Sequence, residues 1–461
     1  MRRPQETLTI DATSDTDSDK EIAGAPVPGL VLIFSADKPA CEVIPLVEGA
    51  VEIGRGEIGG DKRMSRRHAR ITFDGRRFTV RDWGSHNGTS IDGEPLPKGG
   101  ESVARRLLQA GASLFLLATD ITPFRQGVTT TDGGVRGPSL HRALRGIERA
   151  ARFGRVVHVM GESGSGKELA ARAFHNAGPA SGGPFVAVNA ATLPEGLAER
   201  LLFGAKKGAY SGAVDAVGHV QSAHRGTLFL DEVADLNPQV QAKLLRVLET
   251  SEVMPLGATR ADLVDMRLVS ATHKDLRLEV AEGRMREDLF FRIGVPAVGL
   301  PPLRDRPEEI PWLIERALKA VSDRAGGAGS ELRPHVSLVE ACLRRAWPGN
   351  IRELLAEVGA AAQLALEEGG QVMAQHLSPS AGTVVRVARP SPSPAPQDTA
   401  PPQPAAPPRP SDEAITEALR AAGGNVSRAA RELGMHRTQL YRWIARKEGR
   451  ADDGGGDPSK D

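Results

Sequence analysis

Short apolar runs separated by turn residues characterise the chain between residues 29 and 124. Gly- and Asn-rich turns separate them at close spacing, and the runs cover 30–34, 51–53, 69–73, 78–82 and 114–118. Apolar segments of this length and spacing are typical of antiparallel β-strands. We therefore expect an all-β sandwich over residues 27–124.

Helical periodicity then alternates with buried strand-like runs. Helical periods cover 141–152 and 240–248, and the strand-like runs are 156–160, 185–188, 227–230 and 267–271. Such alternation is typical of an α/β domain with a largely parallel sheet. We expect this domain over residues 135–377 with a helical end, and residues 125–137 look like a linker before it.

Composition divides the remainder of the chain. Residues 1–26 hold three basic and six acidic side chains, which predicts a disordered acidic tail. Ten of the 21 residues from 390 to 410 are proline, so we expect an extended linker over 378–410. A small helical domain follows over 411–448, and a polar tail over 449–461.

Overall composition restricts the class of protein. Of the 461 residues, 40% are hydrophobic and the formal net charge is +1, so any nucleic-acid site must be local. Cys41 and Cys342 lie far apart, which excludes a disulfide scaffold and a cysteine zinc site. No apolar run is long enough to span a bilayer, and none follows Met1 as an export signal would require. We expect a cytoplasmic protein without a membrane partner.

A glycine-rich turn follows the apolar run 156–160. Glycines allow backbone N–H groups to surround phosphates, and Lys167 adds a positive charge for their oxygens. Taken alone, the turn is also compatible with an ordinary strand-to-helix connection. The expected nucleotide ligands here are Gly161, Glu162, Ser163, Gly164, Ser165, Gly166, Lys167 and Glu168.

A pair of acidic residues ends the apolar run 227–230. Asp231 at the tip of a buried strand can hold Mg²⁺ through its water shell, and Glu232 can polarise an attacking water. The two motifs together predict a Mg²⁺-dependent nucleotide hydrolase.

At this point the sequence resembles the sigma-54-dependent transcription activators, whose motor is an AAA+ ATPase. The resemblance covers 135–377 and includes the segments GESGSGKE, GAYSGA, REDLFFR and WPGNIREL. The resemblance implies a switch role for Asn189 and sensor roles for Thr272 and Arg352. It also implies that Tyr210 and Ser211 contact sigma-54. Arg286 and Arg292 would be arginine fingers. Tyr210, Ser211 and His273 depart from the usual residues of the family, and a surface loop with ordinary turn glycines is the alternative for the segment 208–213.

The first domain resembles the forkhead-associated (FHA) domain, a β-sandwich that binds phosphothreonine peptides. The order GR, SRRH and NG carries this resemblance, in which Arg55, Ser65 and Arg66 bind phosphate and Asn87 clamps the peptide backbone. His68 would brace the loop. Guanidinium groups and hydroxyl donors suit a doubly charged phosphate. A plain solvated basic face is the alternative for the arginines around Arg66.

The last domain has the plan helix, glycine turn, helix. From residue 425 to 450 there are seven basic and two acidic side chains, as contact with DNA phosphates requires. The segment resembles the Fis-type helix-turn-helix domain, and a basic helical hairpin used only for packing is the alternative. The candidate DNA contacts are Arg437, Thr438, Gln439, Tyr441 and Arg442.

These resemblances together imply an ATP-dependent activator that binds an upstream DNA element and remodels sigma-54 RNA polymerase holoenzyme as a homo-oligomer, a hexameric ring. A phosphothreonine protein or the chain's own phosphorylated tail would occupy the FHA site, which implies a serine/threonine kinase as a further partner. Two alternatives stay open: a DNA-binding regulator whose AAA+ domain assembles without driving sigma-54, and a phosphopeptide-binding adaptor.

Overall fold

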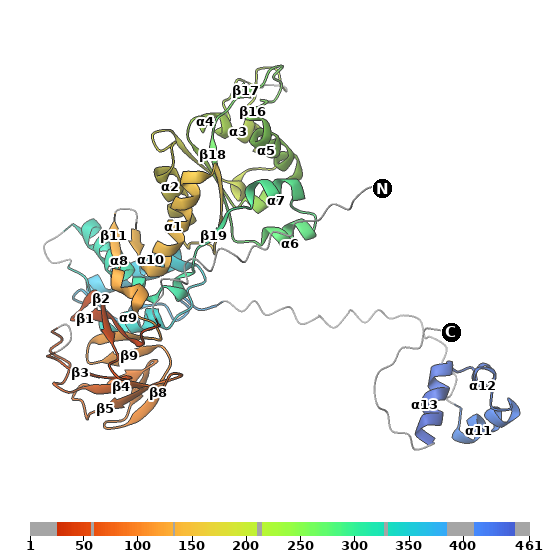
Figure 1. Cartoon of the computed structure of the whole chain (residues 1–461), viewed down its shortest axis with the longest axis horizontal. Helices are drawn as coiled ribbons and strands as arrows, with labels where there is room; N and C mark the ends of the chain where they lie inside the picture. The colour runs from red at the N-terminus through yellow and green to blue at the C-terminus, as the bar shows by residue number, and fades with distance from the viewer. Residues whose placement is uncertain are drawn as a thin grey trace, which may run out of the picture. The chain divides into compact units, whose positions relative to one another are not determined.

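The computed structural model of the chain describes residues 25–56, 60–131, 134–209, 214–326, 331–384 and 410–447 (Figure 1). They divide into two compact units, one within residues 1–385 and the other within residues 386–461. Most of the expected tail 1–26, most of the expected linker 378–410 and all of the expected tail 449–461 lie outside the described residues. No helix of the described ranges is long and apolar enough to cross a membrane.

Two antiparallel sheets form the N-terminal sandwich, which confirms the expected fold class. Their strand orders are β2-β1-β10-β9-β6-β7 and β3-β4-β5-β8. In the register, Leu30 lies opposite Leu117 and Ile71 opposite Val80. The strands are β1 Gly29–Ser35, β2 Lys38–Pro45, β3 Ala50–Ile53, β4 Ala69–Phe73, β5 Phe78–Asp82, β6 Thr89–Ile91, β7 Glu94–Leu96, β8 Glu101–Ala104, β9 Leu107–Ala110 and β10 Ser113–Ala118.

Both faces of the larger sheet are covered. Every residue of β1 is buried. Leu30 and Leu32 face the core between the two sheets, whereas Val31 and Ile33 belong to a second core that contains helices of the C-terminal part of the unit. Since side chains alternate between the faces of a strand, an uninterrupted apolar run such as 30–34 is what burial on both faces requires.

The residues expected to form a linker are structured instead. The 3₁₀ helix η1 (Thr122–Gln126) and the hairpin of β11 (Thr129–Thr131) with β12 (Gly134–Arg136) occupy 122–136. Val135 is buried in the second core. Threonine- and glycine-rich composition resembles that of a linker, but here it forms a hairpin that packs against the rest of the unit.

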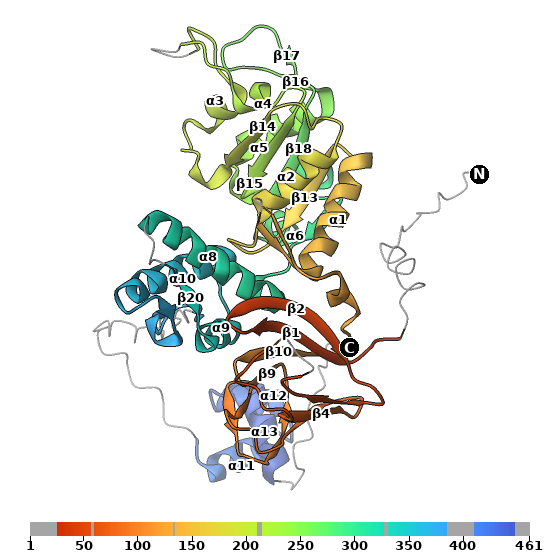
Figure 2. The same cartoon turned by 90° about the vertical axis from the view of Figure 1, so that its left-hand side faces the viewer.

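A five-stranded parallel sheet with helices on both faces follows, as the alternating pattern predicts. Its order is β14-β15-β18-β13-β19. Helices α1 and α2 pack on one face with Phe229, while α3, α5 and α7 pack on the other face with Leu228 and Leu230 (Figures 1 and 2). The strands are β13 Val156–Met160, β14 Phe185–Asn189, β15 Thr227–Asp231, β18 Arg267–Thr272 and β19 Ala297–Gly299.

Local sequence sets several helix boundaries in this domain. Helix α5 begins after Asn237, whose side chain accepts a hydrogen bond from the Val240 N–H at 2.9 Å, and Pro238 occupies its first turn. The helices are α1 Pro138–Phe153, α2 Lys167–Ala177, α3 Ala198–Phe203, α4 His219–Ser222, α5 Pro238–Thr250, α6 Leu276–Ala281 and α7 Glu287–Ile293. Short segments complete it: η2 Ala190–Thr192, η3 Val233–Asp235, β16 Glu252–Val253 and β17 Asp262–Leu263.

A helical lid ends the first unit. Its elements are η4 Leu303–Asp305, η5 Pro307–Glu309, α8 Ile310–Ala325, β20 Arg333–Pro334, α9 Val336–Leu343, α10 Asn350–Glu367, β21 Gln371–Val372 and η6 Ala374–His376. The packed structure continues beyond residue 377. Ala381 is buried in the lid core, and the side chain of Trp347 leaves no room for a Cβ at Gly382.

The second unit contains three helices among its described residues, α11 Asp412–Ala421, α12 Val426–Glu432 and α13 Arg437–Lys447. Ser411 and Asn425 cap the first two, as their residue types predict. Ala429, Ala430 and Leu440 form the core with Ile415. The apolar residues of the helix pair therefore face one common core.

We expect His158 to make the first unit less stable in mild acid. The imidazole is 2% exposed, and its Nδ1 lies 2.9 Å from Ser270 Oγ. Burial lowers the pKa of His158 from 6.5 to about 4. Because the unfolded chain takes up a proton near pH 6.5 that the folded chain refuses, the free energy of unfolding should fall by about 2 kcal/mol from pH 7 to pH 5. Denaturant unfolding of wild type and His158→Gln at both values measures this, and equal losses of stability in the two proteins would contradict it.

Candidate functional site

The expected nucleotide ligands meet at one edge of the parallel sheet. Strands β13, β15 and β18 end there with Met160, Asp231 and Thr272, and the glycine-rich loop leads from β13 into α2. Parallel strands place their carboxyl ends at the same edge, which explains why motifs distant in sequence converge. Gly164 has φ +72°, and a Cβ on it would lie 2.3 Å from the Gly349 carbonyl oxygen of the lid. The loop thus needs glycine here for its conformation and for the close approach of the lid.

Lys167 and the acidic pair form the charged centre of this edge. The Lys167 side chain is 6% exposed, and its Nζ lies 2.7 Å from Glu232 Oε1 and 3.5 Å from Asp231 Oδ1. Burial raises the pKa of Asp231, although Lys167 opposes this. Burial also opposes ionisation of Glu232, but hydrogen bonds from Lys167 and His273 outweigh it and lower the pKa of Glu232 to about 2. Glu232 is therefore a carboxylate at neutral pH.

The Glu232 carboxylate has a second set of donors on β18 and the loop after it. Oε2 accepts hydrogen bonds from Thr272 Oγ1 at 3.1 Å and from the His273 backbone N–H at 3.3 Å, and lies 2.8 Å from His273 Nδ1. Asn189, the expected switch residue, lies in the same pocket, and its side-chain oxygen accepts a hydrogen bond from the Ala191 N–H at 3.0 Å. In this structure Thr272 and His273 orient Glu232.

The lid closes the edge from the other side. Arg352 Nη1 donates to Ser163 Oγ at 3.0 Å, so the expected second sensor does reach the phosphate loop. Asn350 is fully buried, and its Nδ2 donates to Glu162 and to the Ser163 carbonyl. The resemblance at WPGNIREL pointed to Arg352 and missed this role of Asn350.

A pocket of about 410 Å³ lies between the loop and the lid. Its lining includes the charged residues Lys167, Glu232 and Arg352 and the apolar residues Val135, Leu313, Ile351 and Leu355. Sequence reasoning missed the apolar residues because they come from the hairpin and from two lid helices. No cluster of three metal-ligating side chains occurs among the described residues.

Glu168 lines the pocket and also pairs with the exposed Arg172 on α2. Two expected residues, Arg286 and Arg292, lie elsewhere. Arg286 forms a two-pronged ion pair with Asp288, and Arg292 donates to the Leu248 carbonyl at 2.7 Å. Neither arginine lines the pocket that contains Lys167 and Glu232.

The expected sigma-54 contacts Tyr210 and Ser211 lie outside the described residues. The segments that flank them are held together: Ala205 bridges Ala216, and the Lys206 N–H donates to the Leu256 carbonyl at 2.9 Å.

The expected phosphate ligands of the sandwich lie on loops at one end of it. Arg55 is exposed and its Nε donates to the Met64 carbonyl at 2.8 Å. His68 is fully buried, and its Nδ1 accepts from the Ser65 N–H at 3.1 Å. The His68 Nε2–H therefore donates to the Gly88 carbonyl at 3.0 Å, and burial lowers the pKa of His68. The neutral ring joins the loops that carry Ser65 and Asn87, as the expected bracing role requires.

Two further contacts shape this end of the sandwich. Asn87 Nδ2 donates to the Arg63 carbonyl at 2.6 Å, and Ser65 Oγ accepts from the His86 N–H at 3.1 Å. Gly54 cannot carry a side chain, since a Cβ there would lie 1.9 Å from the Arg66 carbonyl oxygen. Arg66 is exposed beside them.

In the second unit, the candidate DNA contacts lie on α13. Arg437, Thr438, Gln439, Tyr441 and Arg442 are all exposed. Leu440 faces the opposite way into the core. In the first turn, Thr438 is hydrogen-bonded within the chain, because its Oγ1 lies 2.7 Å from His436 Nδ1. The helix therefore presents a polar, basic face.

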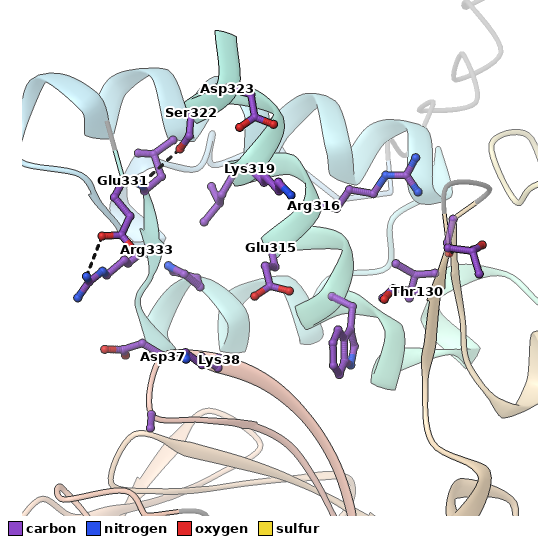
Figure 3. Close-up of a pocket in the computed structure, with 18 residues that line it drawn as sticks. Asp37, Lys38, Thr130, Glu315, Arg316, Lys319, Ser322, Asp323, Glu331 and Arg333 are labelled. Atoms are coloured by element: carbon purple, nitrogen blue, oxygen red, sulfur yellow. Dashed lines mark hydrogen bonds and ion pairs between the residues drawn. The ribbon is translucent and has the colours of Figure 1, made fainter. Parts of the chain in front are cut away.

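A larger pocket of about 1370 Å³ lies between α8, the β1–β2 turn and the β11–β12 hairpin (Figure 3). Glu331 and Arg333 at its margin form an ion pair at 2.9 Å. The charged lining residues balance: Asp37, Glu315, Asp323 and Glu331 against Lys38, Arg316, Lys319 and Arg333. With no net charge to select a ligand, this pocket is a weaker candidate than the sheet edge.

Comparison with known families assigns each part of the chain. The sigma-54 interaction domain matches residues 135–298 and the AAA+ ATPase lid domain matches residues 304–391. The FHA domain matches residues 51–113, and the Fis family of bacterial regulatory proteins matches residues 412–446.

Similar proteins include the acetoin catabolism regulatory protein of Cupriavidus necator, 40% identical over 69% of this chain and 47% of the relative. The transcriptional regulatory protein XylR of Pseudomonas putida is 45% identical over 52% of this chain and 43% of the relative. The chain thus spans about half the length of these two.

The transcriptional regulatory protein ZraR of Klebsiella oxytoca is 39% identical over 67% of both chains. A crystal structure of NtrX from Brucella abortus in complex with ATP is 33% identical over 67% of both chains, with a TM-score of 0.48. The ZraR relative and the family matches show that the chain belongs to the family of sigma-54-dependent transcription regulators, and it combines an FHA domain with an AAA+ ATPase domain and a Fis-type helix-turn-helix.

Proposed function

We propose that this protein is an ATP-driven transcription activator that binds DNA and remodels sigma-54 RNA polymerase holoenzyme under control of phosphothreonine recognition. The observation that carries the proposal is the convergence of Lys167, Glu232 and Arg352 in one pocket between the sheet edge and the lid. Family membership supports nucleotide binding there. Hydrolysis and its coupling to polymerase are the proposed steps.

In this proposal each side chain has a role that its surroundings support. Lys167 neutralises charge on the phosphates of ATP. The phosphates must compete with Glu232 for the Lys167 ammonium group. Lys167 and His273 keep Glu232 ionised and Thr272 helps to orient it, so it can orient a water and accept its proton. The apolar residues of the pocket lining, with Val135 and Leu313, suit the adenine ring.

Mg²⁺ would accompany ATP at Asp231. The donor set fits an ion held mainly by phosphate oxygens and water, since Glu232 is already bound to Lys167 and His273, which leaves Asp231, and the described residues contain no three-residue metal cluster. Such an ion would neutralise charge on the phosphates. Asp231 would hold it through its water shell.

Arg286 and Arg292 would act on a neighbouring subunit. Both are exposed and lie outside the chain's own pocket. Charge developing on the phosphates needs an arginine, so a ring in which each subunit supplies it to the next would complete the site. We infer a hexamer from the family, with Asn189 as a switch that senses the nucleotide.

The two flanking domains would provide regulation and DNA targeting. The exposed face of α13, with Arg437 and Arg442, would enter the major groove of an upstream DNA element. Arg55, Ser65, Arg66 and Asn87 would bind a phosphothreonine made by a serine/threonine kinase, on a partner or on the chain's own tail. Tyr210 and Ser211 would contact sigma-54.

The in-trans arginine generates a mixing prediction. Arg292→Ala and Glu232→Gln should each hydrolyse almost no ATP. Mixed in equal amounts they should recover about a quarter of wild-type turnover if subunits exchange at random, because a quarter of the interfaces then pair two intact halves. Steady-state phosphate release measures this. The matched control mixes Glu232→Gln with Lys167→Ala, which lie on the same side of the interface and should stay inactive; equal behaviour of the two mixtures would refute the in-trans placement.

The phosphothreonine site generates a second prediction. Arg55→Ala removes a charge-assisted hydrogen bond and should weaken binding of a phosphothreonine peptide by about tenfold to a hundredfold. Gly54→Ala should weaken it at least as much, since its Cβ would collide with the Arg66 carbonyl, whereas Gly56→Ala has open space around it and should bind normally. Fluorescence anisotropy with a labelled peptide tests all three, and equal loss in Gly54→Ala and Gly56→Ala would contradict the assignment.

Open-complex formation tests the function as a whole. DNA fragments that the protein binds are first selected, and each is placed upstream of a sigma-54 promoter. Wild-type protein with ATP should then open the promoter, as permanganate footprinting detects, whereas Ser211→Ala should hydrolyse ATP and open little. Robust hydrolysis by wild type without an open complex would favour the alternative, a DNA-binding regulator that assembles without driving sigma-54.

A further inference from the structure

The FHA sandwich and the ATPase lid share one hydrophobic core. Val31 and Leu114 of the sandwich belong to the same buried cluster as Leu313 and Val339 of α8 and α9. Figure 2 shows β1 and β2 beside these helices. Ser90 Oγ donates to Glu340 Oε1 at 3.1 Å at the margin of this contact. One face of the sandwich therefore packs directly against the helices of the lid.

A short segment connects this shared core to the phosphate loop. Leu303, at the start of η4, is buried in the shared core, and its N–H donates to Asn350 Oδ1 at 2.7 Å. The next residue, Arg304, receives a hydrogen bond on its carbonyl from Arg106 of the sandwich. Its own guanidinium donates to both oxygens of Glu162 in the phosphate loop, at 2.7 and 2.9 Å. Arg304 thus touches the sandwich with its backbone and the phosphate loop with its side chain.

Two residues further on, Arg306 holds the same loop at a second point. It is fully buried, and its Nη2 donates to the Ser165 carbonyl at 3.1 Å while its Nη1 pairs with Glu309 at 3.0 Å. Glu309 in turn accepts from the Gly137 N–H at 2.7 Å, just before α1. A buried ion pair is retained at a desolvation cost, and here the arginine of the pair binds the backbone of the phosphate loop while the glutamate binds the backbone before α1.

We propose that Arg304 and Arg306 are positioning residues for the phosphate loop, and that Arg106 of the FHA sandwich steadies Arg304, so that the sandwich itself contributes to nucleotide affinity. The inference rests on the proposed ATP site. A loop already held in its binding conformation loses less entropy when phosphates arrive. Arg304 also neutralises Glu162, which would otherwise repel the phosphates.

Arg106→Ala in the full-length chain tests the contribution of the sandwich. The dissociation constant of a fluorescent ADP and the KM for ATP should both rise by on the order of threefold to tenfold, with kcat at saturating ATP nearly unchanged. Arg105→Ala is the matched control, because it removes the same charge from the neighbouring exposed position. It should bind as wild type does, and both variants should keep the wild-type melting temperature.

Arg304 supplies the second arm, since it is partly exposed and its loss leaves no fully buried charge unpaired. Arg304→Ala should weaken ADP binding more than Arg106→Ala does, and Arg304→Lys should recover part of the loss. In the double variant, Arg106→Ala should add no further loss, because its effect passes through Arg304. Additive losses of ADP affinity in the double variant, or equal ADP binding by Arg106→Ala and Arg105→Ala, would overturn this proposal. If the wild-type chain still hydrolysed ATP, the proposed ATPase function would stand. A wild-type chain that bound no nucleotide would overturn both.

Discussion

Burial of both faces of the sheet β2-β1-β10-β9-β6-β7 is the constraint on which the first unit depends. One face closes the sandwich, and the other places Val31, Ile33, Leu114 and Leu116 in the lid core. Side chains of this size each gain ~1.5–3 kcal/mol when removed from water. Separating the sandwich from the lid would expose all four together with the helices that cover them. The FHA domain is therefore part of the framework of the ATPase.

The phosphate loop depends on that framework in turn. The sheet supplies Asp231, Glu232 and Thr272 at its carboxyl edge, but Glu162 and Ser163 of the loop bond to Asn350 and Arg352 of the lid. The nucleotide pocket thus has a wall from the sheet and a wall from the lid. Its shape is set by how the lid sits on the sheet, and the lid is packed against the sandwich.

Sequence alone predicted the chemistry of the sheet edge because each motif is local. Lys167 follows a glycine-rich turn, and Asp231 ends an apolar run; parallel strand order then brings them together. The residues that sequence missed act across long separations. Arg304 meets Glu162 across 142 positions, and Arg306 meets Ser165 across 141. In the sequence, these two arginines look like any other arginine in a polar loop. Only the fold shows that they contact the phosphate loop.

One signal in the sequence did indicate the shared core. A sandwich strand with a solvated outer face alternates apolar and polar residues, whereas the runs 30–34 and 114–118 are apolar throughout, as strands covered on both sides require. The same argument limits how a phosphopeptide can act. The loops with Arg55, Ser65 and Asn87 carry exposed polar groups, whereas the face toward the lid is apolar and closed. The proposed phosphopeptide would therefore alter loop contacts at small cost, but it would not release the sandwich from the lid without exposing the core that joins them.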